Sequence, residues 1–213
     1  HMREGWLTNR RQMMNRETTK TTNVLVVGTG GQGVITASEI LSDVAMLSGF
    51  DTKKSEIHGM SQRGGVVTSH VRYSEKVYSP MIMEGEADIL LSFELAETVR
   101  WLHYLKPGGR VIASRHRIVP PAVYAGMGSY PQEAERVIRE RSSDPIVVDA
   151  LPLAEELGNP RLVNTLLLAI ASTLLDLPVE GWKTVIADRV PPKFKELNRV
   201  AFERGRDVVT ALA

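Results

Sequence analysis

The sequence contains no cysteine among its 213 residues. This absence excludes disulfides, a thiol nucleophile, cysteine-ligated zinc and ordinary iron–sulfur clusters on this chain. Long hydrophobic runs are missing too, because no stretch approaches the roughly 18 apolar residues that a membrane span requires. The amino terminus also lacks the apolar segment of a signal peptide. We therefore expect a cytoplasmic protein that has no membrane partner.

Charge of one sign is not in excess. Lys and Arg number 26 against 25 Asp and Glu, which leaves a formal net charge of +1 and no long basic run. This balance argues against a nucleic-acid partner. Residues 1–22 carry five of the basic and two of the acidic side chains, begin with a His-Met pair typical of an expression tag, and show little apolar periodicity. We expect them to be a tag scar and a flexible extension.

The remaining residues have ordinary globular composition, since 43% of the chain is apolar and 24% is charged. Their number suits one domain, which we place at residues 23–213. The run from Asn23 to Val27 is apolar after its first residue and ends at Gly28, which is typical of a strand buried on both faces of a parallel sheet.

Strand and helix patterns alternate along this domain. Further strands are expected at 51–57, 66–73, 87–93, 110–114 and 146–149, with a hairpin return at 76–79. Helices are expected at 34–47, 94–105, 131–141, 151–157, 164–175, 180–187 and 192–212. The alternation predicts an α/β fold: a single doubly wound, Rossmann-like and mostly parallel sheet, with a β-hairpin insertion and a helical carboxyl-terminal region.

A glycine-rich loop follows the first predicted strand and precedes the first predicted helix. It fits the pattern G-x-G-x-x-G, and its candidate ligand-binding residues are Gly28, Gly30, Gly31, Gln32 and Gly33. In this context free backbone N–H groups and the helix dipole favour an anion. The alternative is that the glycines only permit a tight turn and close helix packing.

A nicotinamide cofactor would also require an acidic residue about 20 positions further on, at the end of an apolar second strand. Asp51 has roughly the right separation, but it begins a polar segment instead of ending an apolar one. The loop also lacks the Gly-Lys-Ser/Thr of a nucleotide-hydrolysing P-loop.

A second loop, residues 56–65, is rich in glycine and polar side chains. Its candidate ligand-binding residues are Gln62, Arg63, Gly64 and Gly65. Arg63 can offer a planar fork of donors to a carboxylate or a phosphate, or it can form a structural ion pair. His58 is the one candidate for an acid–base role, against the alternative of a hydrogen-bonded loop histidine.

No self-contained catalytic or metal-binding set is evident. His58, His70, His103 and His116 form no i, i+4 pair with an adjacent carboxylate pattern, and no Gly-x-Ser-x-Gly motif occurs. The acidic residues near 88–97 fit a solvated face or contacts with a helix dipole. Apart from His58 as a candidate, we assign no catalytic residue to this chain, and we assign it no metal ligand.

Four segments together resemble one known family. They are Val-Val-Gly-Thr-Gly-Gly-Gln-Gly-Val at 26–34, His-Gly-Met-Ser-Gln-Arg-Gly-Gly at 58–65, Tyr-Ser-Pro at 78–80 and Gly-Glu-Ala-Asp-Ile-Leu-Leu at 85–91. The chain resembles the gamma-type domain of the 2-oxoacid:ferredoxin oxidoreductases over about residues 22–208. The form of the second segment favours the indolepyruvate branch over the pyruvate and 2-oxoglutarate branches.

The resemblance implies a small, non-autonomous subunit. In that family the assembled enzyme decarboxylates a 2-oxoacid on thiamine diphosphate, passes electrons through iron–sulfur clusters to ferredoxin, and releases an acyl-CoA. Thiamine diphosphate, magnesium and the clusters are then expected on a large partner subunit, with CoA as a co-substrate and no cofactor bound by this chain alone. Self-association of the isolated chain through surface meant for its partner stays open.

Two other interpretations remain at this point. The chain could be a stand-alone dinucleotide-binding module that uses the glycine loop, or a scaffold subunit whose two loops serve only folding and the interface. About 20 residues before the first strand depart from the family pattern, and the sequence does not decide their origin.

Overall fold

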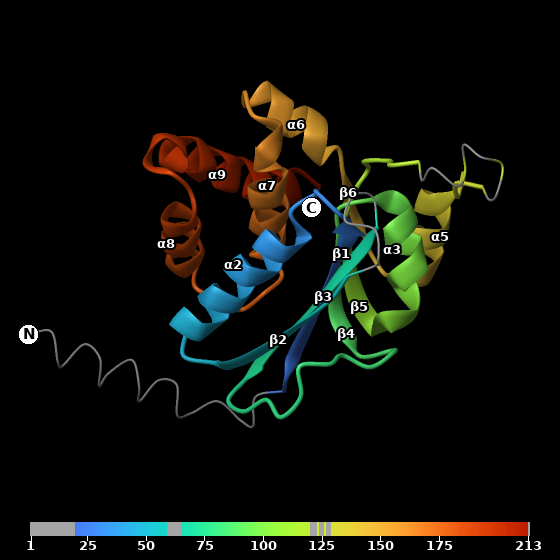
Figure 1. The fold of residues 1–213 in the computed structure, drawn as a ribbon, viewed down its shortest axis with the longest axis horizontal. Coiled ribbons are helices and arrows are strands. Elements are labelled where there is room, and N and C mark those ends of the chain that lie inside the picture. Colours follow the sequence, from blue (N-terminus) through green and yellow to red (C-terminus); the bar gives the residue numbers. More distant parts are fainter. Residues whose placement is uncertain (1–19, 59–64, 120–122, 124–125, 127–128, 213) are drawn as a thin grey trace, which may run out of the picture.

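One sheet with helices on both faces organises the chain (Figure 1). The structure is a computed structural model that describes residues 20–58, 65–119, 123, 126 and 129–212, so most of the predicted extension at 1–22 lies outside the described residues. Within that part, six strands are hydrogen-bonded in the order β2-β3-β1-β4-β5-β6. They are β1 Thr22–Thr29, β2 Asp51–His58, β3 Val66–Ser74, β4 Ala87–Ser92, β5 Leu105–Ser114 and β6 Ile146–Val148.

The helices match the predicted segments closely. They are α2 Val34–Leu47, α3 Leu95–Trp101, α5 Ala134–Arg141, α6 Ala150–Glu156, α7 Val163–Ala171, α8 Val179–Arg189 and α9 Lys195–Leu212, with 3-10 turns at Leu102–Tyr104, Pro160–Leu162 and Pro192–Phe194. The helix predicted at 94–105 is too long, because β5 already begins at Leu105 and includes the Pro-Gly-Gly segment expected to follow the helix. None of the described helices has both the length and the apolar content that a membrane crossing demands.

The central strand β1 explains why the sheet is mixed. It pairs in parallel with β4 and antiparallel with β3, and Val24 to Val27 are completely buried. β3 also runs against β2, whereas β4, β5 and β6 continue in parallel. Only β3 among the described strands therefore opposes the common direction. The predicted α/β, mostly parallel fold is confirmed.

The hairpin lies elsewhere than the sequence predicted. The expected return at 76–79 is wrong, because β3 pairs along its length with β2, from Asp51 opposite Ser74 to His58 opposite Val67. Side chains instead hold the segment after β3 as an irregular connection: Arg72 Nη1 donates to the carbonyls of Ser79 (3.0 Å) and Met81 (2.9 Å). Periodicity could not find this, because β2 is a lysine-rich edge strand with little apolar alternation.

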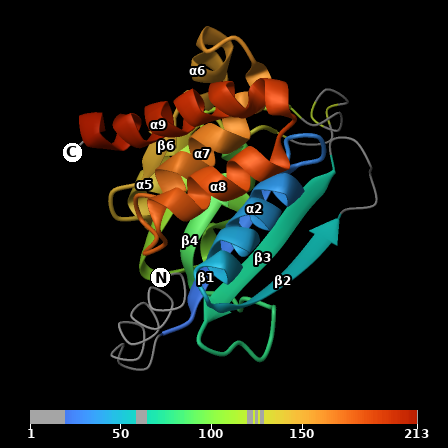
Figure 2. The same cartoon turned by 90° about the vertical axis from the view of Figure 1, so that its left-hand side faces the viewer.

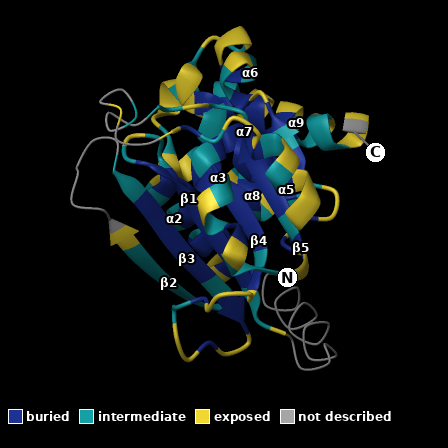
Figure 3. Ribbon diagram, turned by 90° about the vertical axis from the view of Figure 1, so that its right-hand side faces the viewer, coloured by how far each residue is buried: buried dark blue, intermediate teal, exposed yellow. Residues whose placement is uncertain are grey.

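Two apolar cores lie on opposite faces of the sheet. Helices α2, α7, α8 and α9 cover one face (Figure 2), where Val24, Val26, Leu41, Leu167 and Trp182 belong to one cluster of buried residues. Helices α3 and α5 cover the other face, and the sheet strands are mostly buried beneath them (Figure 3). Burial from both sides is what the continuous apolar run of β1 requires.

His70 on β3 is a buried histidine that structure, and not catalysis, explains. It is 0% exposed, its Nδ1 accepts a hydrogen bond from the Ile82 N–H at 3.2 Å, and its ring meets that of Tyr104 edge to face. Its Nε2 has no hydrogen-bond partner within the described residues. Burial therefore lowers the pKa of His70 below its ordinary value of 6.5.

This shift predicts acid sensitivity. Above pH 6.5 the neutral ring is favoured in both states, but below it the unfolded chain takes up a proton that the folded chain resists. The free energy of unfolding should fall by up to about 1.4 kcal/mol per pH unit from this group as pH drops from 6.5 toward the folded pKa. Urea unfolding at pH 7.5 and 5.5 should show a shallower fall for His70→Asn, whose amide oxygen can still accept from Ile82. Equal falls in both proteins would contradict this assignment.

Candidate functional site

The glycine loop lies where the helices change faces. β1 and β4 are parallel neighbours, and their carboxyl ends meet with Val27 opposite Ser92. The helix that follows β1, α2, covers one face of the sheet, while the helix that follows β4, α3, covers the other (Figure 1). This is a topological switch point, the place where open α/β sheets bind ligands.

Gln32 fixes the loop to both strands. Its Oε1 accepts hydrogen bonds from the Thr29 N–H (2.8 Å) and the Thr29 hydroxyl (3.0 Å), and its Nε2 donates to the Phe93 carbonyl (2.9 Å). Because these bonds use both ends of the amide, we expect Gln32 to position the loop and contribute little to direct ligand binding. It still lines the pocket described below.

Two glycines permit close approach of the chain here. A Cβ at Gly28 would lie 2.8 Å from Val34 Cγ2 and 3.0 Å from the Phe93 Cβ. Gly33 has φ +86° at the start of α2, and a Cβ there would lie 2.2 Å from Asn164 Nδ2, which donates to the Gly33 carbonyl. The tight-turn interpretation of the glycines is thus correct for these two positions, whether or not a ligand binds.

The amino terminus of α2 has no side-chain cap. Gly33 occupies the capping position, and no acidic residue lies in the first turn. The first-turn N–H groups and the positive end of the helix dipole therefore lack a compensating negative group from α2 itself. Such an end favours an anion.

A pocket of about 360 Å³ opens beside this helix end. Its lining combines loop residues with residues from distant parts of the chain: Gly31, Gln32, Gly33, Phe93, Ser114, His116, Leu151, Pro160, Arg161, Val163 and Asn164. The volume is within the range of small-molecule sites. Most of these residues follow the carboxyl ends of β1, β4 and β5 or lie around the start of α7.

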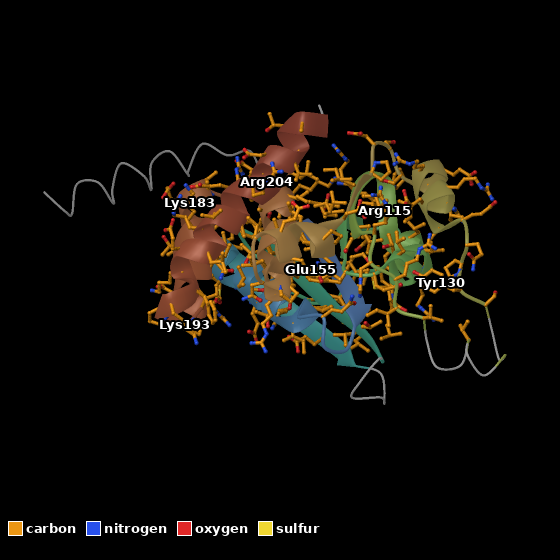
Figure 4. All side chains as sticks on the ribbon, turned by 90° about the horizontal axis from the view of Figure 1, so that it is seen from above. Arg115, Tyr130, Glu155, Lys183, Lys193 and Arg204 are labelled. Carbon is orange, nitrogen blue, oxygen red and sulfur yellow. The ribbon has the colours of Figure 1, made fainter. Side chains whose placement is uncertain are left out.

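Arg161 supplies the pocket's cation. It is exposed, lies in the turn Pro160–Leu162, and its guanidinium makes no ion pair with any described residue. Arg115 lies between the lining residues Ser114 and His116 in the sequence. Its charge is already neutralised, because its Nε donates to Glu135 (2.8 Å) and its Nη1 contacts Asp149. Figure 4 shows Arg115 on the α5 side and Glu155 on α6 in the middle. Arg161 lines the pocket and is available to an anion.

The second predicted loop begins and ends at the end of the sheet where β1 leads into the glycine loop. Gly65 accepts a hydrogen bond at its carbonyl from the Gly30 N–H (2.8 Å), and His58 ends β2 opposite Val67. The two glycine-containing segments are therefore adjacent, as a shared site requires. Gln62, Arg63 and Gly64 lie outside the described residues, so their roles stay predictions.

A buried carboxylate holds the α3 side of the switch point. Glu94 is 1% exposed and accepts hydrogen bonds from the N–H groups of Glu97 (2.9 Å) and Ile118 (3.0 Å) and from the Tyr130 hydroxyl (2.5 Å). Burial and the bond to Glu94 raise the pKa of Tyr130. Glu94 thereby caps α3 and fixes the chain after β5, so it has a structural role.

The acid considered for a dinucleotide ribose lies at the wrong end of the sheet. Asp51 begins β2, whereas the glycine loop follows the end of β1, and β3 separates the two strands. Its carboxylate is also engaged: bonds from Lys53 and from the Val77 N–H lower the pKa of Asp51 to about 2. The dinucleotide interpretation therefore lacks its acidic residue.

Sequence reasoning missed Arg161, His116 and Asn164. Each comes from a segment that no motif marks, and only the fold brings them to the glycine loop. The Asn-Pro-Arg sequence after α6 was a weak signal, since Asn159 caps the turn that presents Arg161. Among the described residues, no group of three His, Asp or Glu side chains is arranged to hold a metal ion.

Comparison with known proteins identifies the family. Residues 23–208 match the family described as pyruvate ferredoxin/flavodoxin oxidoreductase. A curated relative, the indolepyruvate oxidoreductase subunit IorB of Thermococcus kodakarensis, is 39% identical over 86% of this chain and 93% of its own length. The common gamma subunit of the pyruvate/ketoisovalerate oxidoreductases of Pyrococcus abyssi is 29% identical over 83% of this chain and 93% of its own.

Solved structures show the same fold. The gamma subunit of a keto/oxoacid ferredoxin oxidoreductase from Geobacter sulfurreducens has a TM-score of 0.67 at 23% identity, covering 89% of this chain and 99% of that one. A 2-oxoglutarate:ferredoxin oxidoreductase from Magnetococcus marinus gives 0.71 at 21% identity, with 92% of this chain matching 32% of that chain. The chain belongs to the pyruvate ferredoxin/flavodoxin oxidoreductase family, and the resemblance noted from its motifs is confirmed.

Gly31 and Gly33 form a matched pair for testing the loop geometry. Both have positive φ, +97° and +86°, but a Cβ at Gly31 would meet nothing within 4 Å. Gly31→Ala should cost about 1 kcal/mol of stability for the left-handed conformation. Gly33→Ala should cost about 3 kcal/mol, because it also displaces Asn164. Urea unfolding would measure both, and equal losses would show that the contact with Asn164 is unimportant.

Proposed function

We propose that this chain is the small subunit of an indolepyruvate-type oxidoreductase, an enzyme that converts aryl pyruvates to arylacetyl-CoA and passes the electrons to ferredoxin. The relatives named as indolepyruvate oxidoreductase subunits are 32–39% identical to it, against 26–29% for pyruvate, ketoisovalerate and 2-oxoglutarate subunits. This order supports the indolepyruvate branch. We place the activity in the cytoplasm and in residues 23–213.

The cofactors of such an enzyme do not fit this chain. It has no cysteine to hold an iron–sulfur cluster, and its described residues offer no carboxylate and histidine group for a metal-bound diphosphate. When bound, thiamine diphosphate supplies the decarboxylation chemistry and the clusters carry the electrons. We assign both, with magnesium, to a large partner subunit through which ferredoxin is reduced.

In this proposal the chain contributes an anion-binding surface at the switch point. The observation that carries this proposal is the coincidence of the uncapped end of α2 with the unpaired Arg161 in one pocket. Two positive elements favour a group with more than one negative oxygen, such as the diphosphate of CoA. The Magnetococcus marinus relative was solved with 2-oxoglutarate, coenzyme A and succinyl-CoA bound, which supports CoA over a free phosphate.

Two alternative functions have less support. A gamma subunit for pyruvate or another 2-oxoacid would use the same pocket, because substrate choice should reside largely in the partner. A stand-alone dinucleotide module is disfavoured by the position of Asp51. His58 is the last residue of β2, at the end of the sheet that carries the pocket. It stays the candidate acid–base residue of this chain.

The assembly itself can be tested directly. Coexpression with the native large subunit should give a stable complex that reduces ferredoxin or a viologen dye with indolepyruvate and CoA, and omission of either chain should abolish the activity. A complex that is inactive on indolepyruvate but active on another 2-oxoacid would contradict the branch. Failure to form any complex would contradict the subunit proposal.

Arg161→Gln tests the pocket. In the assembled enzyme it should raise the KM for CoA about tenfold and leave kcat nearly unchanged, because it removes a charge-assisted contact made equally before and during the reaction. Arg199→Gln is the matched control, since Arg199 is an exposed arginine of α9 that pairs with Glu196 and Glu203. The same assay on Arg63→Ala tests the second loop. An unchanged KM for CoA and for the 2-oxoacid would remove the corresponding residue from the site.

A further inference from the structure

A second pocket, of about 470 Å³, lies at the opposite end of the strands. Its lining includes Thr22 at the start of β1, Ser74 at the end of β3 and Ile89 near the start of β4. These positions are at the end of the sheet away from the glycine loop. Since β1 spans eight residues, the two pockets are separated by roughly 25 Å along the strand. The second pocket therefore cannot be part of the proposed CoA site.

Arg110 gives this pocket an unsatisfied donor. Its Nε is buried and has no hydrogen-bond partner, while its Nη2 donates to Asp144 at 2.8 Å. A buried guanidinium N–H without an acceptor is costly in a folded protein. The ion pair with Asp144, whose side chain is 85% exposed, uses Nη2 and leaves the Nε–H without an acceptor among the described residues. Because an ion pair this exposed to solvent is weak, Arg110 can still pair with a further carboxylate.

Both carboxylates of the lining are already engaged. Asp88 accepts a hydrogen bond from the Asn23 N–H (2.8 Å) and pairs with Lys106, and Asp176 also has an interaction of its own. These two carboxylates would repel a phosphate that carries two negative charges. They repel a group with a single negative charge less, and Lys20 and Arg110 are the cations of the lining that such a group would meet.

The rest of the lining is apolar and aromatic. Phe50 and Tyr73 have ring centroids 5.4 Å apart, and Leu174 and Leu175 join them in the pocket. Burial raises the pKa of Tyr73, so its hydroxyl stays protonated at neutral pH and adds no negative charge. Aromatic and leucine side chains favour a flat or branched hydrocarbon body over a sugar or a polar chain.

We propose that this pocket, lined by Phe50, Tyr73, Arg110, Leu174 and Leu175, binds a small monocarboxylate with an aryl or branched apolar body. The carboxylate pairs with Arg110, and the hydrocarbon packs against the two aromatic rings and the two leucines. The site is separate from the switch point, so an occupant can act on this chain without competing for the CoA pocket.

Titration of the full chain with phenylacetate, followed by ¹H–¹⁵N NMR, tests the proposal. Amide signals of Phe50, Tyr73 and Leu175 should shift saturably, with a Kd of about 1 mM or below. Phenylacetamide has the same shape without the charge and should bind at least about tenfold more weakly. Equal binding of the two compounds, or shifts confined to the glycine loop, would overturn the proposal.

Substitutions of Arg110 provide a second test of the proposed site. Arg110→Gln should weaken phenylacetate binding at least about tenfold, and Arg110→Lys should weaken it less because the charge remains. Arg136→Gln is the matched control, since Arg136 is exposed on α5 and pairs with Glu133 and Glu140. Unchanged binding by folded Arg110→Gln would overturn the site. This assay contains neither CoA nor a partner chain, so its failure would leave the proposed subunit function untouched.

Discussion

The three hydrogen bonds of Gln32 are the constraint on which the functional end of this protein depends. They tie the end of β1 to the end of β4 at the point where α2 and α3 leave toward opposite faces. The Phe93 N–H bond to the Val27 carbonyl and the Asn164 bond to the Gly33 carbonyl support the same arrangement. Gln32, one of the predicted ligand-binding residues, therefore positions the loop, and the first-turn N–H groups of α2 are left to meet a ligand.

The proposed role of this chain is binding and positioning. Because the sequence has no cysteine, cysteine-ligated redox clusters are excluded from it. The two pockets described above differ in charge. The switch-point pocket combines a helix end with the unpaired Arg161, which suits a multiply charged group. The pocket around Arg110 mixes cations with engaged carboxylates and aromatic rings, which suits a single charge on an apolar body.

Two buried polar side chains show how tertiary packing decides which of them receive hydrogen bonds. Glu94 receives three hydrogen bonds and organises the chain after β5, whereas His70 receives one and must remain neutral. Both residues were ordinary polar positions in the sequence, with no motif to distinguish them. Their different roles come from the number of hydrogen-bond donors that tertiary packing brings to each, since a buried polar group is costly unless it is hydrogen-bonded.

The sequence by itself determined the fold class, the position of the glycine loop and the family, because continuous apolar strands, helical periodicity and glycine spacing are local signals. It could not determine that β3 inserts between β1 and β2, since a lysine-rich edge strand carries no apolar pattern and pairing partners are set by packing. Nor could it find Arg161, which is 128 or more residues beyond the glycine loop in the chain and reaches it only through α6 and α7. Local patterns encode elements, but a site built across a switch point exists only when the whole sheet is assembled.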